Sequence, residues 1–258
     1  MALSDISSSI SRLPTVPGPL PPRNDRGGKA VRNHMLLSIP DEEFAALRPL
    51  LEPVDLPRYL VLYDQGKRIV HAHFLNDGMV SLVVLTNDGR SVEVGISGRE
   101  GIVGAPLAFR FQAAPMRAIV QLPGSGLRIP SEVLQEALAI SPQLRNAMER
   151  YLMLQQMQVA QIAACNRLHE MDQRLARWLL MCQDRIDSEM LPLTHEFIAQ
   201  MLGSGRPTVT IAAGVLERAG LIENTRGSVK ILNRKRLEDA ACECYAVIQN
   251  YNGNLSLK

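Results

Sequence analysis

The chain has 258 residues with a formal net charge of +2, of which 46% are hydrophobic and 21% are charged. This length and composition predict a soluble protein with room for two hydrophobic cores. The near-neutral charge does not by itself indicate a nucleic-acid-binding protein, so any such affinity must come from local placement of charge. No apolar run approaches 18 residues and no signal peptide is evident, so we expect a cytoplasmic protein without a membrane partner.

Residues 1–32 are rich in Ser, Pro, Gly and Arg, and their closely spaced prolines disfavour regular structure. This composition predicts a disordered tail. Its basic residues are candidates for weak phosphate contacts. These residues are Arg12, Arg23, Arg26, Lys29 and Arg32. We favour a passive tail, or an over-long start, over a DNA-binding arm.

A short helix is predicted over DEEFAALRPLL, residues 41–51, because its acidic first turn suits the helix dipole. From Val54 to Ile129 the chain becomes a succession of short β-type runs separated by Asp-, Asn- and Gly-containing turns. They include YLVLY, IVHAHF, MVSLVVL, RSVEVGI and RAIVQL. Strands at such regular spacing predict an antiparallel sandwich or barrel in a protein of the α+β class.

Two histidines, His71 and His73, lie two residues apart in one β-type run and therefore on one face of it. With Gly66 upstream and Asp77 downstream, their spacing partly resembles the first metal-binding motif of cupin enzymes. The Gly-to-His spacing differs from that motif, and no second motif with a third histidine follows. We interpret both as ordinary strand residues and expect no metal site. A cupin-like metal enzyme with a helical appendage remains the alternative.

The helical half of the chain begins at SEVLQEALAI, and a long helix is predicted from about Pro142 to Leu168. Its apolar stripes are too broad for one contact surface. We expect one side to pack on the β-region and the other, including Ile162, on a second copy of the chain. A solvated monomeric helix is the alternative. A break near residues 169–172 predicts a hinge, after which Trp178 is expected to anchor a second core.

The stretch from Leu193 to Gly220 predicts two helices joined by a sharp turn. Thr194 is suited to cap the first helix, and Gly203-Ser204-Gly205 supplies the turn. The second helix is predicted to begin near Arg206. Its inward stripe is expected to comprise Val209, Ala212, Val215 and Leu216. Its outward face is expected to comprise Arg206, Pro207, Thr210, Ile211 and Gly214. Small, nearly uncharged residues on that face suit a helix that enters the major groove of DNA.

After this helical pair, LIENTRGSVKILN predicts a β-hairpin turning at residues 225–228, and Asn233 is suited to cap one closing helix over residues 234–250. Cys242 and Cys244 would then lie about 200° apart on that helix, unsuited to binding one metal ion. We interpret all four cysteines, Cys165, Cys182, Cys242 and Cys244, as ordinary core or surface residues.

The order of helix, GxGR turn, helix ending LERAGLI, and hairpin resembles the winged helix-turn-helix of the Crp/Fnr superfamily of bacterial transcription regulators. The resemblance covers nearly all of the chain after the first 30 or so residues. It implies a jelly-roll-like β-roll sensor over 33–141, a dimerisation helix over 142–169 and a DNA-binding domain over 170–258. The DNA-contacting residues that it implies are Thr194, Ser204, Gly205, Arg206, Pro207, Thr208, Thr210, Ile211 and Arg226.

The resemblance also locates a candidate effector pocket. In cyclic-nucleotide-binding members a Gly-Glu pair and an Arg-Ser or Arg-Thr pair hold the ribose and the cyclic phosphate. The nearest matches here are Gly104-Ala105 and Arg117-Ala118, which lack the carboxylate and the hydroxyl. A bound nucleotide would leave a buried polar group unpaired at a cost of roughly 1 to 3 kcal/mol, so we do not expect cyclic AMP to bind. The effector is therefore unknown.

No cysteine precedes Cys165, which argues against the iron–sulfur cluster that some relatives bind near the N-terminus, and we expect no cofactor. The resemblance implies a non-enzymatic regulator that binds a palindromic operator as a homodimer and contacts RNA polymerase. A nucleotide-sensing scaffold that never binds DNA is a further alternative.

Overall fold

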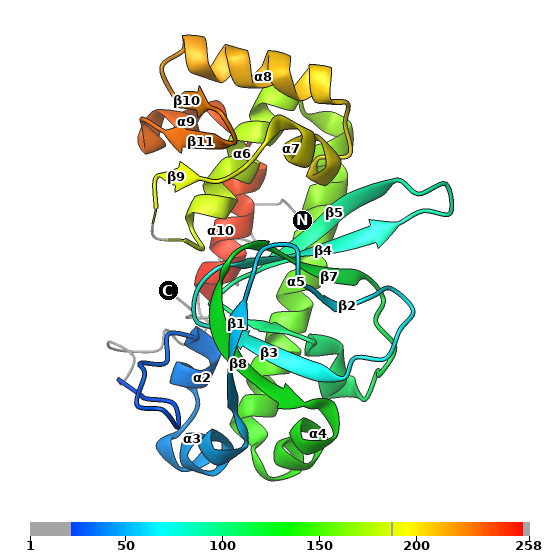
Figure 1. The fold of residues 1–258 in the computed structure, drawn as a ribbon, viewed down its shortest axis with the longest axis vertical. Coiled ribbons are helices and arrows are strands. Elements are labelled where there is room, and N and C mark those ends of the chain that lie inside the picture. Colours follow the sequence, from blue (N-terminus) through cyan, green and yellow to red (C-terminus); the bar gives the residue numbers. More distant parts are fainter. Residues whose placement is uncertain (1–21, 187, 255–258) are drawn as a thin grey trace, which may run out of the picture.

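The computed structural model describes residues 22–186 and 188–254 of the chain. Residues 1–21, which include the predicted basic-arm residue Arg12, lie outside the described part. A β-rich body and a helical body are stacked along the long axis of the molecule, and one long helix runs beside both of them (Figure 1). No helix among the described residues is long and apolar enough to cross a membrane.

The β-rich body consists of two four-stranded antiparallel sheets, with strand orders β1-β8-β3-β6 and β2-β7-β4-β5. The first sheet contains β1 (Glu52–Leu56), β3 (His71–Leu75), β6 (Ile102–Val103) and β8 (Gly124–Pro130). The second sheet contains β2 (Val61–Tyr63), β4 (Met79–Leu85), β5 (Ser91–Ser97) and β7 (Arg117–Leu122). The five predicted β-type runs fall on β2, β3, β4, β5 and β7, whereas β1, β6 and β8 were not predicted.

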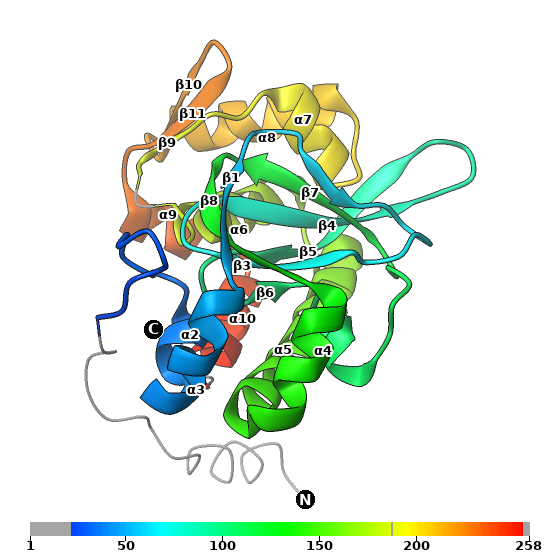
Figure 2. The same ribbon diagram turned by 60° about the horizontal axis from the view of Figure 1, so that its bottom comes forward.

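Short helices close the lower end of this body, as Figure 2 shows from below. They are α2 (His34–Ser38), α3 (Asp41–Leu47) and α4 (Ser131–Ile140). The 3-10 turns η1 (Arg48–Leu50) and η2 (Ala105–Phe109) also belong to this part of the chain. The β-body core contains Phe74, Val80, Leu127 and Ile129 from the strands, with Leu144 of the long helix packed against them. Burial of the long helix against a sheet core follows from its apolar stripe.

The start of the described chain, residues 22–32, is folded against α2 and α3, which corrects the predicted extent of the disordered tail. Arg23 is buried, and its guanidinium donates hydrogen bonds to backbone carbonyls of the α2 region and to the Asp41 carboxylate at 2.7 Å. Arg32 forms an ion pair with Asp77 at 2.5 Å. Both arginines already have partners within the chain, so neither guanidinium is free to contact a DNA phosphate.

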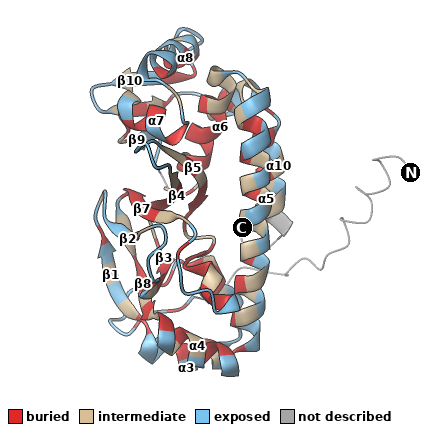
Figure 3. Cartoon of the chain, turned by 90° about the vertical axis from the view of Figure 1, so that its right-hand side faces the viewer, coloured by how far each residue is buried: buried red, intermediate tan, exposed pale blue. Residues whose placement is uncertain are grey.

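The long helix α5 (Pro142–Leu168) has the predicted bounds, and α6 (Met171–Gln183) begins after the predicted break. The α6 start is fixed by a capping box between Glu170 and Gln173. The helical body continues with β9 (Met190–Leu191), α7 (His195–Met201), α8 (Arg206–Arg218), β10 (Ile222–Thr225), β11 (Ser228–Ile231), α9 (Arg234–Ala240) and α10 (Cys244–Asn254). The α10 helix lies alongside α5, as Figure 3 shows.

Two expectations about the helices are wrong. Ile162 was assigned to a surface shared with a second copy, but only 5% of it is exposed, and it packs in a core with Trp178 of the same chain. The closing helix, predicted as one element, is divided into α9 and α10 by residues 241–243. Cys242 therefore lies outside a helix, and the angular argument that separated it from Cys244 does not apply.

Candidate DNA-binding surface

The turn between α7 and α8 is built as its residue types require. Thr194 caps α7, and its hydroxyl oxygen accepts a hydrogen bond from the Phe197 amide at 3.2 Å. Gly203 has φ +61°, a left-handed conformation that favours glycine. A Cβ atom at this position would lie 2.9 Å from a side-chain carbon of Val92 in the β-body. Both the left-handed backbone conformation and the close approach of Val92 therefore favour glycine at position 203.

The second helix, α8, begins at Arg206, with Gly205 as its N-cap residue and Pro207 in its first turn. Its buried residues are Val209, Ala212, Ala213 and Leu216. Val215 was predicted to face inward, but it is 40% exposed, and Ala213 takes its place. The inward stripe was thus predicted correctly at three of its four positions.

The outward face of α8 is open to solvent. It carries Arg206, Pro207, Thr208, Thr210 and Ile211, all exposed, with Ile211 at 68%. The helix lies at one end of the molecule with its outer side uncovered (Figure 1). The Arg206 guanidinium has no hydrogen bond or ion pair with any of the described residues. An unpaired guanidinium at the start of an open helix face can reach an external acceptor.

The hairpin after α8 is the predicted one, with Thr225 opposite Ser228 and the exposed Arg226 at its tip. His195 connects this hairpin to both helices of the motif: its Nδ1 lies 3.1 Å from Thr210 Oγ1, and its Nε2 lies 3.1 Å from Asn224 Oδ1. The structure therefore assigns His195 a positioning contact that the sequence did not indicate.

Residues 173–240, which include both helices and the hairpin, match the family model of the Crp-like helix-turn-helix domain. The C-terminal part of the chain is a Crp-like helix-turn-helix domain. The predicted resemblance to the Crp/Fnr superfamily is confirmed for this domain. Over 197 residues the chain is 26% identical to the "Global nitrogen regulator" of Synechococcus elongatus, covering 69% of this chain and 87% of that protein.

Solved structures of two other proteins have a similar fold. FixK2 from Bradyrhizobium japonicum is 17% identical with a TM-score of 0.64, covering 74% of this chain and 98% of that chain. A CRP-family transcriptional regulator from Thermus thermophilus is 24% identical with a TM-score of 0.59, covering 73% of this chain and 96% of that chain. At these identities the similarity establishes the arrangement of β-roll, long helix and helix-turn-helix, and not a ligand or an operator.

The Crp-like domain is joined to the β-roll by buried polar contacts. Glu93 of β5 accepts hydrogen bonds from Trp178 Nε1 at 2.8 Å and from Ser81 Oγ at 2.6 Å. Burial raises the pKa of the Glu93 carboxyl to about 7, although these two hydrogen bonds act in the opposite direction. Arg185 and Glu100 form a second buried link, with an Nη2–Oε1 distance of 2.7 Å.

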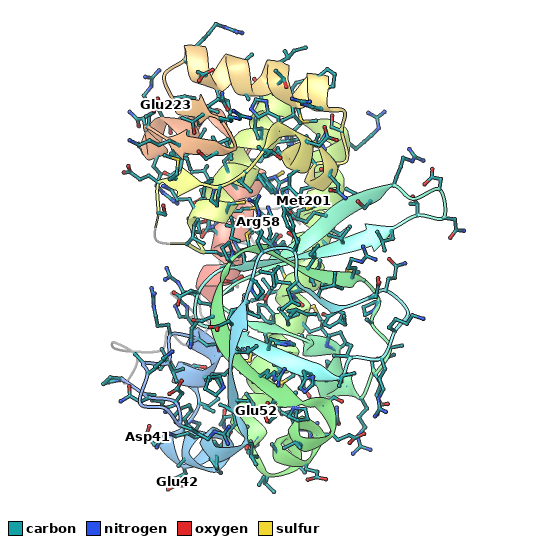
Figure 4. All side chains as sticks on the ribbon, in the orientation of Figure 1. Asp41, Glu42, Glu52, Arg58, Met201 and Glu223 are labelled. Carbon is teal, nitrogen blue, oxygen red and sulfur yellow. The ribbon has the colours of Figure 1, made fainter. Side chains whose placement is uncertain are left out.

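An aromatic contact lies at the same boundary. The Arg58 guanidinium is 4.8 Å from the ring centroid of Tyr59 and 5.7 Å from that of Phe197 in α7. Figure 4 shows Arg58 at the junction of the two bodies. The orientation of the Crp-like domain is therefore set by side chains of the β-roll as well as by α5.

The predicted effector residues are not brought together in one place. Gly104 and Ala105 line a cavity of ≈ 180 Å³ between the β-roll and α5, together with Leu82, Ile102 and Val159. Arg117 is not part of its lining and forms a two-bond ion pair with Asp64, at 2.9 Å for each bond. Ala118 is buried in the β-roll core. Among the residues that the structure describes, no arginine or lysine lines this mainly apolar cavity to neutralise a cyclic phosphate.

The two strand histidines do not form a convincing metal site. His71 and His73 share a face, with ring centroids 6.3 Å apart, as the alternation of the strand predicts. Burial first, and then the charges of His71 and Arg128, lower the pKa of His73 to about 4. A cation would have to bind beside the positive Arg128. Within the described chain, no third metal-ligating side chain joins this pair.

Proposed function

We propose that this chain is a sequence-specific transcription regulator that binds a palindromic operator as a homodimer, with α8 in the major groove. The open outward face of α8, which begins at the unpaired guanidinium of Arg206, is the observation that carries this proposal. Family membership supports it. By the same reasoning the protein acts in the cytoplasm, contacts RNA polymerase and performs no catalysis.

Base reading is assigned to Arg206 and Ile211. A guanidinium can donate two parallel hydrogen bonds to guanine O6 and N7, and an isoleucine can contact a thymine methyl group. Thr208 at the start of α8 and Arg226 at the tip of the hairpin are placed for phosphate contacts, which add affinity without sequence information. Thr194, Ser204, Gly205, Pro207 and Thr210 complete the proposed surface. One G·C pair in each half-site is therefore assigned to Arg206.

Selection of bound DNA from a random pool tests this proposal. Enrichment of an inverted repeat with half-site centres about 10 to 11 base pairs apart is expected. Arg206→Ala should then cost about 1 to 3 kcal/mol and relax one position, whereas Arg226→Ala should weaken all sequences alike. A pool without any enriched sequence would favour the scaffold alternative. Equal loss for all operators in Arg206→Ala would refute the assignment of the base reader.

The dimer surface is assigned to the solvent face of α5. Met153, Ala160 and Ala164 are exposed there and Met157 is half-buried, at spacings of four, three and four residues. This is the spacing by which two parallel helices pack along a shared seam, and alanines permit close approach. Because Ile162 is buried in the core of its own chain, we assign the dimer seam to the surface that contains Ala160 instead.

Sedimentation of two charge variants tests the seam. Ala160→Glu is expected to give a monomer with much weaker operator binding, because the charge would be buried against the partner copy. Ala45→Glu on α3 introduces the same charge at another exposed helical alanine and should leave the dimer intact. If both variants remain dimeric, the choice of surface is wrong.

The effector is proposed to be a small, largely apolar molecule in the cavity between the β-roll and α5. The apolar lining, and the absence of Arg117 from it, support this chemistry over a cyclic nucleotide. Calorimetry with cyclic AMP should give no saturable binding. A micromolar isotherm lost in Arg117→Ala would show that Arg117 leaves Asp64 to bind the phosphate.

A further inference from the structure

Four metal-ligating side chains converge where α5 meets the end of the Crp-like domain. Cys165 and His169 lie at the end of α5, Cys242 lies in the link between α9 and α10, and Cys244 is the first residue of α10. Their ligand atoms all lie within 4.8 Å of one another. Cys165 Sγ is 3.5 Å from Cys242 Sγ, and Cys244 Sγ is 3.5 Å from His169 Nδ1. We propose that this cluster binds one Zn²⁺ ion in a tetrahedral Cys₃His site.

The spacing of the ligand atoms fits one ion. Zinc–sulfur bonds of about 2.3 Å and zinc–nitrogen bonds of about 2.0 Å at tetrahedral angles require S···S and S···N separations of about 3.5 to 3.8 Å. The Cys165–Cys242 and Cys244–His169 separations are at the lower end of this range, and no two of the four ligand atoms are more than 4.8 Å apart. Three thiolates and one imidazole form a closed structural set for zinc. The compactness of the cluster leaves no room for an inorganic core of several irons and sulfides.

The imidazole of His169 is oriented as a zinc ligand requires. Its Nδ1 faces the cysteines, while its Nε2 lies 3.2 Å from the Glu243 carboxylate. A carboxylate on the far nitrogen fixes the tautomer that leaves Nδ1 free to coordinate a metal. Gln161 Nε2 donates to Cys244 Sγ at 3.1 Å, which stabilises negative charge on that sulfur.

The charge around the cluster also matches a bound ion. Zinc with three thiolates and a neutral imidazole carries a net charge of −1. Arg177 is 2% exposed, its Nε has no hydrogen-bond partner, and its positive charge acts on Cys165. Arg174, half-buried, also interacts electrostatically with Cys165. Buried cations beside a net negative centre compensate part of its charge.

The location gives the ion a structural role. His169 lies two residues before α6 and Cys242 lies two residues after α9, so the ligands lie on both sides of the helix-turn-helix and hairpin. Zinc would join the entry and the exit of this segment to the end of α5. A cross-link that closes such a long loop restricts the unfolded chain and fixes the segment relative to α5.

Metal analysis of the reduced, full-length protein tests the site. One zinc per chain is expected after reconstitution, and Co²⁺ should give the intense visible absorption of a tetrahedral, thiolate-rich site. Cys242→Ser should lose both the metal and the metal-dependent rise in Tm. The matched control is Cys182→Ser, because Cys182 lies buried in α6 outside the cluster and should leave one metal per chain.

Glu243→Gln keeps all four ligands and should lower zinc affinity about 10- to 100-fold, which provides a measurement if Cys242→Ser does not fold. Four free thiols in the unfolded wild-type chain, with neither zinc nor cobalt bound after reconstitution, would overturn the proposal. A Cys165–Cys242 disulfide that persists in the reduced preparation, or metal retained by Cys242→Ser, would overturn it as well.

Discussion

Replacing Glu93 by Gln tests how the ionisation of one buried carboxyl group affects stability. This carboxyl lies at the boundary between the β-roll and the Crp-like domain. Glu93 is fully buried and accepts hydrogen bonds from Trp178 and Ser81. Glutamine has nearly the same shape as a protonated glutamate: its oxygen can accept from Trp178, and its amide can donate to the Ser81 hydroxyl. The substitution therefore removes the charge and keeps the packing and both hydrogen-bond positions.

The folded-state pKa sets the sign and the size of the effect. Burial raises this pKa from 4.5 to about 7, so the folded protein binds more protons than the unfolded chain between these values. The contribution of Glu93 to the free energy of unfolding therefore falls as pH rises through this window and is constant above it. At about 1.36 kcal/mol per pKa unit, the total loss is on the order of 3 kcal/mol.

Urea unfolding of wild type and Glu93→Gln at intervals from pH 4.5 to pH 8 measures this loss. The stability of the variant relative to wild type should increase by about 3 kcal/mol across the window. Trp178, the only tryptophan, should report the titration by fluorescence in wild type and not in the variant. Glu136→Gln on the exposed face of α4 is the matched control and should follow wild type. Parallel stability curves for wild type and Glu93→Gln would refute the reasoning.

Three further substitutions have expected outcomes. Arg185→Met should lower the free energy of unfolding by about 3 kcal/mol because it leaves Glu100 buried without its cation, and adding Glu100→Gln should restore part of this in the same urea assay. Gly101→Ala would place a Cβ atom 2.0 Å from the Tyr151 ring, and calorimetry should show a lower Tm, with a cost of about 1 to 3 kcal/mol. His195→Ala removes two contacts that hold α8 and the hairpin, so the operator Kd should rise about fivefold, equivalent to about 1 kcal/mol.

The fold was predictable where a repeating pattern faced a single core. The long helix α5 has the predicted bounds, and β4 and β7 match their predicted runs, because regular burial of one face imposes a period on the sequence. The β8 strand was missed because two glycines and a proline make it resemble a turn region, although pairing with β1 and β3 on both sides holds it extended. Tertiary pairing here overrides local preference.

In the candidate DNA-binding surface and the cavity, too, local features were predictable from the sequence, whereas tertiary contacts were not. The turn at Gly203 and the N-cap at Thr194 follow from local backbone chemistry, and both were predicted. The contacts of His195 and the ion pair that removes Arg117 from the effector cavity depend on residues 15 to 53 positions away in the chain. Such pairings leave no periodic signal in one sequence.

The closing region shows why a periodic signal can also mislead. Residues 234–250 satisfy a helical pattern on both sides of residues 241–243, so spacing alone predicts one helix. The break between α9 and α10 moves Cys242 off the helix and toward Cys165, 77 positions earlier in the chain. A helical angle between Cys242 and Cys244 is meaningless once the helix ends before Cys242.

The cavity between the β-roll and α5, where we propose that the effector binds, shares structural elements with the boundary to the Crp-like domain. Gly95 of β5 lines the cavity, and two residues earlier on the same strand Glu93 accepts the hydrogen bond from Trp178. On α5, Val159 lines the cavity, and one turn later Ile162 packs in the core that contains Trp178. If β5 or α5 shifts at the cavity, the contacts that this element makes with Trp178 of α6 must adjust as well, because close-packed neighbours transmit strain. The Glu93→Gln variant probes that boundary without altering a single cavity-lining residue.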